Sequence, residues 1–356
     1  MDLILSVLYC VLILAFKIPL VILAYFTFYF FKKGHKSPNL FQRISATIFK
    51  TFQFHLPLWL IRKLYNSCGT LKIISHEQKK HWVKKLDASN EKNGWEGYLI
   101  ADDVEHSEIG KDVDMIILYA HGGGYVCGNA LIFLSTFIDW IKAWKLSYGA
   151  RTQILSLEYR LAPEYSFPAS RENLVACYQW LVNEKKISPS KITFAGDSAG
   201  GNLVVTSAIH LVNQLHVVPP AALLLISPCV NGITSAQSFI SNDSFDCINI
   251  TWFHRCLELY LGDSNLPPTC PMISPIFENK LSGLPKVWAC VGSYEVFLDD
   301  VKLFIEKLLS NNVKAELTIE DANIHAYAVE KLLSRNGAYD NTIKRIGEFL
   351  YGENIN

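Results

Sequence analysis

The pattern that most constrains the fold begins near residue 95, from which short apolar runs alternate with longer amphipathic stretches. Apolar runs of this length predict buried strands, and the amphipathic stretches predict helices. We expect strands at Trp95–Ala101, Met115–Ala120, Gln153–Glu158, Ile192–Ala195, Ala222–Ile226, Lys286–Val291 and Lys314–Ile319. We expect helices at Leu131–Trp144, Arg171–Asn183, Ala199–Gln214, Asp299–Ser310 and Tyr339–Tyr351. This alternation predicts an α/β fold with a mostly parallel central sheet flanked by helices.

The composition of the chain excludes several classes of protein. With 356 residues, of which 50% are hydrophobic, the chain can bury a full core, so disorder and small disulfide scaffolds are excluded. Its 33 basic and 33 acidic residues cancel. A nucleic-acid-binding protein needs an excess of basic residues to displace counterions from phosphate, so no nucleic-acid partner is expected.

The segment 1–31 is expected to be a transmembrane anchor. The run from Leu3 to Phe31 carries a single charge, Lys17, and a helix needs only about 20 apolar residues to span a bilayer. A cleaved signal peptide is disfavoured because Asp2 replaces the usual basic start and no small-residue cleavage site follows. The run can form one span, with Lys17 reaching toward one face, or a hairpin at Lys17-Ile18-Pro19. We favour one span that ends near Phe31.

Residues 32–94 are expected to form a basic segment close to the membrane. Residues 32–90 contain twelve Lys or Arg and only two acidic residues, which gives a net charge of +10. Such a segment can press on anionic lipid, or it can be an ordinary solvated face. Within it, the semi-apolar stretch 40–65 suits a helix that lies along a bilayer or caps an apolar pocket.

The nine cysteines are scattered and include no C-x-x-C pair, so neither a metal nor another cofactor is expected. Cys247, Cys256 and Cys270 lie close enough in sequence for a disulfide in an oxidising compartment, but reduced apolar fillers fit equally well. Sequons for N-glycosylation occur at Asn242 and Asn249, about as many as chance gives. Neither the cysteines nor the sequons determine the cellular compartment of the protein.

The strongest chemical signal is Gly196-Asp-Ser-Ala-Gly200, which follows the fourth expected strand and opens a helix. A serine can sit exposed on a tight strand-to-helix turn only if its neighbours two residues away are small. Gly196 and Gly200 meet this condition, so Ser198 is the candidate nucleophile. The helix that starts at Ala199 would offer its N–H group and its positive end to an oxyanion.

A second motif, His121-Gly122-Gly123-Gly124-Tyr125, ends the strand that finishes at Ala120. Consecutive glycines leave backbone N–H groups unshielded, so that a substrate carbonyl oxygen can approach them. We expect Gly122, Gly123 and Gly124 to build an oxyanion hole together with Ala199, with Gly122 shaping the loop. A phosphate-binding loop is the competing use of glycines, but no G-K-[ST] motif accompanies them.

A serine nucleophile needs a histidine base and a carboxylate that orients it, and both follow the serine in this arrangement. His325 is the only histidine downstream of the Lys286–Val291 strand, and it follows the last strand by a short loop, so we assign it as the base. For the acid we favour Glu295 over Asp299, because Glu295 lies nearer the strand end, whereas an acid at Asp299 can serve the next helix as a cap.

These motifs resemble the hormone-sensitive-lipase-like group of α/β-hydrolase esterases over roughly residues 95–350. The resemblance rests on H-G-G-G-Y at 121–125, Y-R-L-A-P-E at 159–164 and G-D-S-A-G-G-N at 196–202. It implies the α/β-hydrolase fold and a structural role for the Y-R-L-A-P-E segment. The family acid is normally the first Asp of D-x-L-x-D, and here the aligned stretch begins with Glu295 and ends with Asp299.

With its N-terminal anchor, the chain is similar to two branches of this group, the fungal steryl acetyl hydrolases and the animal arylacetamide deacetylases. Both imply a single-pass, membrane-bound deacetylase of the endoplasmic reticulum, and the layout favours the fungal branch. The domain 95–356 would then be catalytic, with residues 230–270 as a cap insertion. Its partners would be the bilayer and a lipophilic ester such as a steryl acetate, with no obligate protein partner.

Other functions remain open from the sequence. The substrate can instead be an aryl amide, a xenobiotic ester or a glyceride. Outside enzymes, hormone receptors of this fold keep the pocket but lack the histidine, so His325 opposes that alternative. The basic residues after Phe31 predict a cytosolic catalytic domain, whereas the fungal relatives imply a lumenal one.

Overall fold

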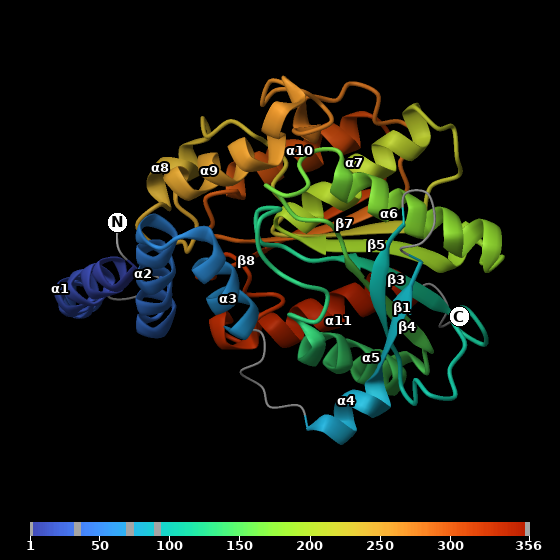
Figure 1. Cartoon of the computed structure of the whole chain (residues 1–356), viewed down its shortest axis with the longest axis horizontal. Coiled ribbons are helices and arrows are strands. Elements are labelled where there is room, and N and C mark those ends of the chain that lie inside the picture. The colour runs from blue at the N-terminus through green and yellow to red at the C-terminus, as the bar shows by residue number, and fades with distance from the viewer. Residues whose placement is uncertain (1–2, 32–36, 69–74, 89–93, 353–356) are drawn as a thin grey trace.

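The computed structural model describes residues 3–31, 37–68, 75–88 and 94–352 of the chain. Its centre is a single eight-stranded sheet in the order β1-β2-β4-β3-β5-β6-β7-β8 (Figure 1). The strands are β1 (Val83–Asp87), β2 (Glu96–Ile100), β3 (Met115–Ala120), β4 (Thr152–Glu158), β5 (Ile192–Asp197), β6 (Ala222–Ile226), β7 (Lys286–Gly292) and β8 (Ala315–Glu320). Strand β2 pairs antiparallel with both of its neighbours, β1 and β4, and all other neighbouring strands pair parallel. The expected α/β-hydrolase architecture is confirmed.

Helices cover both faces of this sheet (Figure 1). One face packs on α5 (Leu134–Tyr148) and α11 (Ala338–Tyr351). The other packs on α6 (Ala169–Gln179), α7 (Ala199–Asn213) and α10 (Leu298–Ser310). Strands β5 and β6 are buried along their whole length, which explains why they read as continuous apolar runs rather than as alternating ones.

Two local differences from the expected elements have clear causes. Helix α5 runs to Tyr148, four residues further than expected, because its terminator is Gly149 in the left-handed region at φ 65°. Strand β1 was not expected, because its sequence V-K-K-L-D is mostly charged. It is an edge strand, where exposed charges are common, so its pairing with β2 leaves no apolar signature. The sheet therefore extends into the segment that was expected to lie at the membrane.

The apolar N-terminus forms one continuous helix, α1 (Leu3–Phe31), which runs unbroken through Lys17 and Pro19. The hairpin alternative is therefore wrong. By length and composition, residues Ile4–Thr27 are apolar enough to cross a membrane, with a mean hydropathy of 2.6, and little of this stretch is buried against the protein. Lys32 and Lys33, which begin the basic segment, lie outside the described residues.

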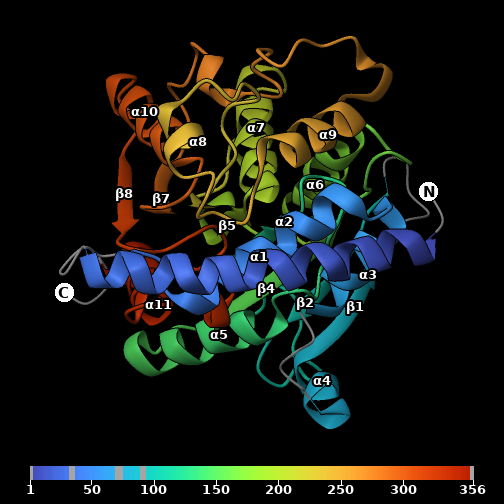
Figure 2. The same ribbon diagram turned by 90° about the vertical axis from the view of Figure 1, so that its left-hand side faces the viewer.

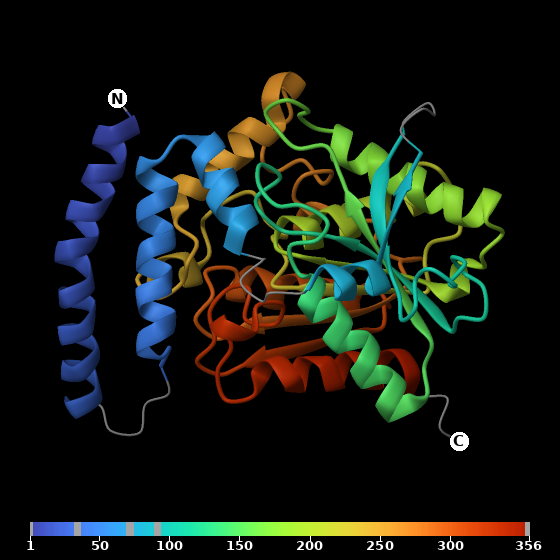
Figure 3. The same cartoon turned by 60° about the horizontal axis from the view of Figure 1, so that its bottom comes forward.

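Helix α1 packs along α2 (Leu40–His55), and the two run antiparallel across one side of the domain (Figures 2 and 3). Helix α2 begins with a capping box between Asn39 and Gln42. It ends at His55, two residues before Pro57, which cannot continue a helix, and α3 (Leu58–Cys68) follows in a new direction. A short helix, α4 (His76–Trp82), then leads into β1.

The segment between β6 and β7 contains α8 (Gln237–Ser241) and α9 (Ile250–Leu261). Both helices lie beyond the carboxyl ends of the parallel strands, on the same side as α2 (Figure 1). Helix α9 packs against α2, so two stretches about 200 residues apart in the sequence meet over the end of the sheet. Ligands bind at this edge in open parallel sheets.

Candidate active site

Ser198 lies on the tight turn between β5 and α7. Its backbone has φ 53° and ψ −118°, a conformation that few residues other than glycine adopt. A Cβ atom on Gly196 would lie 2.5 Å from the backbone of Gly200, and one on Gly200 would lie 2.0 Å from the carbonyl oxygen of Ala120. No larger residue fits either position, and this is the condition that the sequence motif predicted.

The glycine loop after β3 lies directly against this turn. The N–H of Gly122 donates to Asp197 Oδ1 at 2.8 Å, and the hydroxyl of Tyr119 donates to the same oxygen at 2.8 Å. The next two glycines take positive φ angles, 113° for Gly123 and 65° for Gly124. Asp197 therefore fixes the loop, and Gly122 has a shaping position because its N–H is already occupied.

Three backbone donors around Ser198 remain available. Among the described residues, the N–H groups of Gly123, Gly124 and Ala199 have no hydrogen-bond acceptor, and all three residues line the same cavity as Ser198. Ala199 is buried and the two glycines are half-buried, and backbone N–H groups removed from solvent are nearly always paired. Unpaired donors that line one cavity with Ser198 therefore indicate a site that binds an oxygen. An oxyanion is the ligand that such a group suits.

His121 has a structural role in this loop rather than a chemical one. Its ring is fully buried, stacks on Tyr159 at 4.3 Å and has Nδ1 2.7 Å from the carbonyl oxygen of Gly122. Burial lowers the pKa of His121 to about 4, so this ring is neutral at physiological pH. The hydroxyl of Tyr159 donates to the His121 carbonyl oxygen at 2.6 Å.

The Y-R-L-A-P-E segment braces the same loop from the other side. Besides the Tyr159 contact, the N–H of Ala162 donates to the carbonyl oxygen of Tyr125 at 2.9 Å. Its Glu164 forms a bidentate pair with Arg62 of α3, and Arg62 Nε also donates to the Val126 carbonyl oxygen at 2.6 Å. The segment thus ties helix α3 to the glycine loop, which agrees with a structural role.

His325 and Glu295 meet behind the serine. Nδ1 of His325 lies 3.1 Å from Oε2 of Glu295, and both side chains are buried. The other carboxylate oxygen of Glu295 accepts from the N–H of Gly292 at 2.6 Å and from the hydroxyl of Ser227 at 2.7 Å. Among the described residues, Nε2 of His325 has no hydrogen-bond partner, Ser198 included, and His325 and Ser198 line the same cavity.

Asp299 is not part of this pair. One of its carboxylate oxygens accepts from the N–H of Ser238 at 3.0 Å, and the other faces Lys302. It sits in the first turn of α10, where an acidic side chain is favourable for the helix. Of the two acids considered from the sequence, the structure brings Glu295 to the histidine.

The carboxylates around the histidine change its electrostatics. Burial by itself lowers the pKa of His325, but the hydrogen bond and charge of Glu295, with smaller contributions from Asp246 and Asp197, raise it above its usual value. Burial raises the pKa of Glu295, and His325 partly offsets this effect. Burial also raises the pKa of Asp197 to about 6, against the lowering effect of its donors Tyr119 and Gly122.

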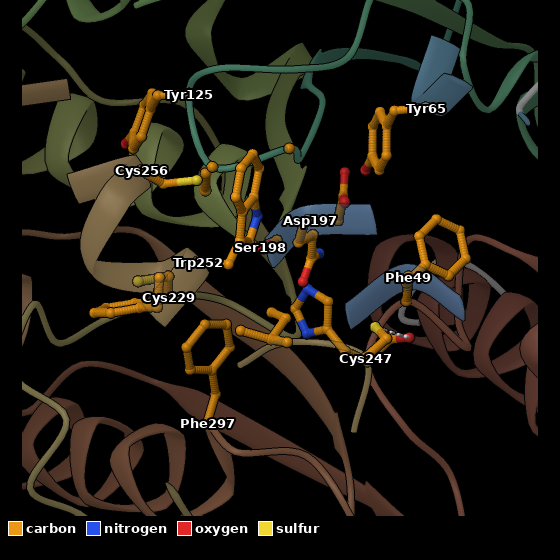
Figure 4. A pocket seen from close by; sticks show the side chains of 18 of the residues that line it. Phe49, Tyr65, Tyr125, Asp197, Ser198, Cys229, Cys247, Trp252, Cys256 and Phe297 are labelled. Carbon is orange, nitrogen blue, oxygen red and sulfur yellow. Dashed lines mark hydrogen bonds between the residues drawn. The ribbon is translucent and has the colours of Figure 1, made fainter. Parts of the chain in front are cut away.

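A cavity of about 280 Å³ lies over Ser198 (Figure 4). It is lined by residues of the glycine loop, by Ser198 and His325, and by residues of α2, α3 and α9, among them the aromatic side chains of Phe49, Tyr65 and Trp252. A second cavity of about 210 Å³ shares these three residues and continues between α2 and α3. Both stretches that were expected to cap an apolar pocket therefore contribute to its lining.

Several of the polar residues around the site carried no signal in the sequence. Asp246 and Ser227 belong to no motif and reach the site only because the fold brings their segments there. Tyr119 lies just before the glycine loop in sequence, but its contact with Asp197 had no sequence signal. The sequon residue Asn242 is buried, and its amide donates to the carbonyl oxygen of Glu295 at 2.8 Å. The second sequon residue, Asn249, caps α9.

The structure also bears on disulfide bonds and on metal binding. Cys247, Cys256 and Cys270 are free thiols, so the disulfide alternative is not formed. Within the described ranges, no three His, Cys, Asp or Glu side chains gather in a way that could hold a metal ion.

Comparisons with known protein sequences find a matching family model and similar proteins. A family model for the α/β hydrolase fold matches residues 117–329. The chain is 30% identical to an esterase of Acinetobacter venetianus, over 57% of this chain and 64% of that protein. It is 34% identical to an acetyl-hydrolase of Streptomyces hygroscopicus, over 52% of this chain and 59% of that protein. The matched region thus spans less than two thirds of either relative.

Solved structures agree over a larger part of the chain. The crystal structure of an esterase from the bacterial hormone-sensitive lipase family is 28% identical, with a TM-score of 0.72 over 89% of this chain and 99% of that one. A hormone-sensitive lipase from a metagenome library is also 28% identical, with a TM-score of 0.71 over the same shares.

Proposed function

Because the chain belongs to the α/β-hydrolase family, in its hormone-sensitive-lipase-like group, we propose that it is a membrane-anchored serine ester hydrolase. The observation that carries this proposal is that three residues whose N–H groups have no acceptor in the described chain line one cavity with Ser198 and with His325, which pairs with Glu295. The names of relatives, an esterase and an acetyl-hydrolase, support the same reaction class.

In the proposed reaction, Nε2 of His325 takes the proton of the Ser198 hydroxyl while the oxygen attacks the ester carbonyl carbon. The negative charge on the carbonyl oxygen is stabilised by the N–H groups of Gly123, Gly124 and Ala199. Glu295 holds the imidazole in one tautomer and stabilises its protonated form. His325 then gives the proton to the leaving alcohol, and a water molecule releases the acyl group by the same steps.

The lining of the cavity supports a neutral, lipophilic substrate. No lysine or arginine of the described chain lines it, whereas Phe49, Trp252, Phe253 and other apolar side chains do. A phosphorylated or anionic ester would need a cationic partner, and an apolar ester gains from burial against these rings. We propose an acetyl ester of a lipophilic alcohol, such as a steryl acetate, and the name of the Streptomyces relative supports the acetyl part.

The exposed rim of the cavity supports access from lipid. Phe41 and Leu332 both line the cavity, yet they are 52% and 57% exposed. They flank the contact in which Gln42 of α2 donates to the carbonyl oxygen of Leu333, and α1 packs beside α2. We propose that α1 spans the membrane of the endoplasmic reticulum once and holds this rim near the bilayer.

Substrate class is tested with membranes that contain the full chain. We expect hydrolysis of a steryl acetate to exceed that of a glyceryl ester and of an aryl amide, and Ser198→Ala to abolish all three. Preference for the amide would favour an arylacetamide deacetylase, and preference for the glyceride a lipase. Failure of a fluorophosphonate to label Ser198 would favour a binding protein without catalysis, an alternative that the pairing of His325 with Glu295 opposes.

The side of the membrane is tested by protease protection of intact microsomes. The basic residues that follow α1 favour a cytosolic domain, and the fungal resemblance favours a lumenal one. Endoglycosidase treatment adds little for Asn242, whose amide is engaged inside the fold, so any mobility shift would report on Asn249.

A further inference from the structure

A short polar segment of the cap contacts two loops of the site. One follows β7 and carries Glu295, and the other follows β8 and carries His325. They are called the catalytic loops. This segment, residues 242–247 between α8 and α9, is called the clip segment below. At its start, the amide of Asn242 donates to the carbonyl oxygen of Glu295 at 2.8 Å. At its end, the thiol of Cys247 faces the carbonyl oxygen of His325 at 3.9 Å.

Asp246 makes the strongest of these connections. Its side chain is fully buried, and its two oxygens accept three backbone N–H groups. Oδ1 accepts from Cys247 at 2.8 Å and from His325 at 3.0 Å, and Oδ2 accepts from Val296 at 2.8 Å. An ionised carboxylate only accepts hydrogen bonds, so three N–H donors satisfy it without any other partner.

We propose that Asp246 is a positioning residue for the acid–base pair: its carboxylate joins the loop that carries Glu295 to the loop that carries His325. The inference rests on the proposed function, because it assigns Asp246 a role in that reaction. Val296 directly follows Glu295, and His325 is held by its own backbone N–H, so Asp246 adds a buried side-chain bridge next to the acid and the base. The two loops are also joined farther from this pair, where the N–H of Tyr294 donates to the carbonyl oxygen of Asn323 at 3.0 Å.

This connection is more than a local packing contact. The two catalytic loops follow β7 and β8, and their only covalent link runs through α10 and β8. Catalysis is sensitive to displacements of about 1 Å between reacting groups. The clip segment belongs to the cap, and Cys247 also lines the cavity, where Figure 4 shows its side chain. Asp246 therefore transmits the position of the cap to the acid–base pair.

The charge of Asp246 also acts on the histidine. Three carboxylates face His325: Glu295 from the loop after β7, Asp246 from the clip segment and Asp197 from the end of β5. Each of them raises the pKa of His325, against the lowering effect of burial. Removal of the Asp246 charge should therefore lower this pKa, whereas a residue that serves only the stability of the fold would leave it unchanged.

The test compares Asp246→Asn with native full-length protein in detergent, with p-nitrophenyl acetate as substrate. We expect kcat to fall about tenfold or more, because an amide places an N–H₂ group against backbone donors. We expect KM to change little and the acid limb of the kcat/KM profile to move to lower pH. An acid limb at the native position, or native kcat, would overturn the inference.

Asp300→Asn is the matched control, because Asp300 is also a buried carboxylate but contacts Asn231 and neither catalytic loop. It can lower the melting temperature and should leave the acid limb in place. If Asp246→Asn does not fold, Asp246→Glu carries the test. This variant keeps the negative charge but moves it. We therefore expect a low kcat together with an acid limb of the kcat/KM profile near the native position. A native kcat for this variant would contradict the inference. A native protein without esterase activity would refute the proposed function itself.

Discussion

The carboxylate of Asp197 accepts a hydrogen bond from the backbone N–H of Gly122 at 2.8 Å, which links the residue before Ser198 to the first glycine of the glycine loop. The two residues are 75 positions apart in the sequence. The same oxygen also accepts from the Tyr119 hydroxyl. One buried carboxylate therefore helps to fix the position of Ser198 relative to the glycine loop, beside the pairing of β3 with β5.

Replacement of this carboxylate should impair the oxyanion loop. Asp197→Ala leaves the Gly122 N–H and the Tyr119 hydroxyl without an acceptor, and we expect kcat to fall about 100-fold, near the cost of losing one oxyanion donor. Asp197→Asn is the control, because an amide oxygen can still accept both hydrogen bonds. Kinetics with p-nitrophenyl acetate measure both variants, and full activity of Asp197→Ala would refute the coupling.

The identity of the triad acid is decided by a pair of variants. Glu295→Gln keeps the shape of the side chain but loses the charge next to Nδ1 of His325, so kcat should fall by about 10³–10⁴-fold. Asp299→Asn should leave kcat near the native value, because Asp299 contacts Ser238 and Lys302 instead. The reverse ranking of these two variants would reassign the acid.

The pH dependence should follow the raised pKa of His325. The base must be neutral to accept the Ser198 proton, so kcat/KM should rise with pH through a value above that of an ordinary histidine. The ion pair with protonated His325 stabilises the fold below the unfolded pKa of about 6.5, and this contribution is lost as pH rises through the higher folded value. Titration of kcat/KM gives the limb, and Glu295→Gln should move it to lower pH.

The strand-to-helix turn should tolerate no Cβ atom at Gly200. In Gly200→Ala the new atom would lie 2.0 Å from the carbonyl oxygen of Ala120, which belongs to a central strand and cannot yield. We expect the free energy of unfolding to fall by about 3 kcal/mol or more. Gly352→Ala is the control, because no atom lies within 4 Å of its Cβ position. Urea unfolding of both variants measures the difference.

Removal of α1 should separate membrane attachment from catalysis. None of the residues that line the cavity in the described chain belongs to α1, so a chain that starts at Ser37 should keep its activity on p-nitrophenyl acetate. The full chain should stay in the pellet after carbonate extraction, and the shortened chain should appear in the supernatant. A shortened chain that still sediments would show that another surface binds the membrane.

The local elements of the site could be predicted from sequence because each needs only neighbouring residues. The turn around Ser198 requires small residues at Gly196 and Gly200, and the glycine loop requires positive φ angles at Gly123 and Gly124, which the structure has. Catalytic roles for these residues, and for His325 and Glu295, stay predictions until the variants are measured. In the sequence, the main observation that favoured Glu295 over Asp299 as the acid was that Glu295 lies nearer the end of the preceding strand.

Sequence by itself indicated the strands and helices that alternate from residue 95 onward, the apolar segment at the N-terminus and the two glycine motifs, because periodicity and local sterics act over a few residues. It missed the charged edge strand β1 and left open whether the apolar segment is one helix or a hairpin. Only the tertiary structure decided which distant groups meet. The pairing of Glu295 with His325, the Asp197 contact to Gly122 and the contacts of Asp246 to the N–H groups of Val296 and His325 join segments 30 to 79 residues apart. Such contacts arise where the sheet order brings strand ends together, and hydrogen bonds between buried polar groups leave no periodic trace in the sequence.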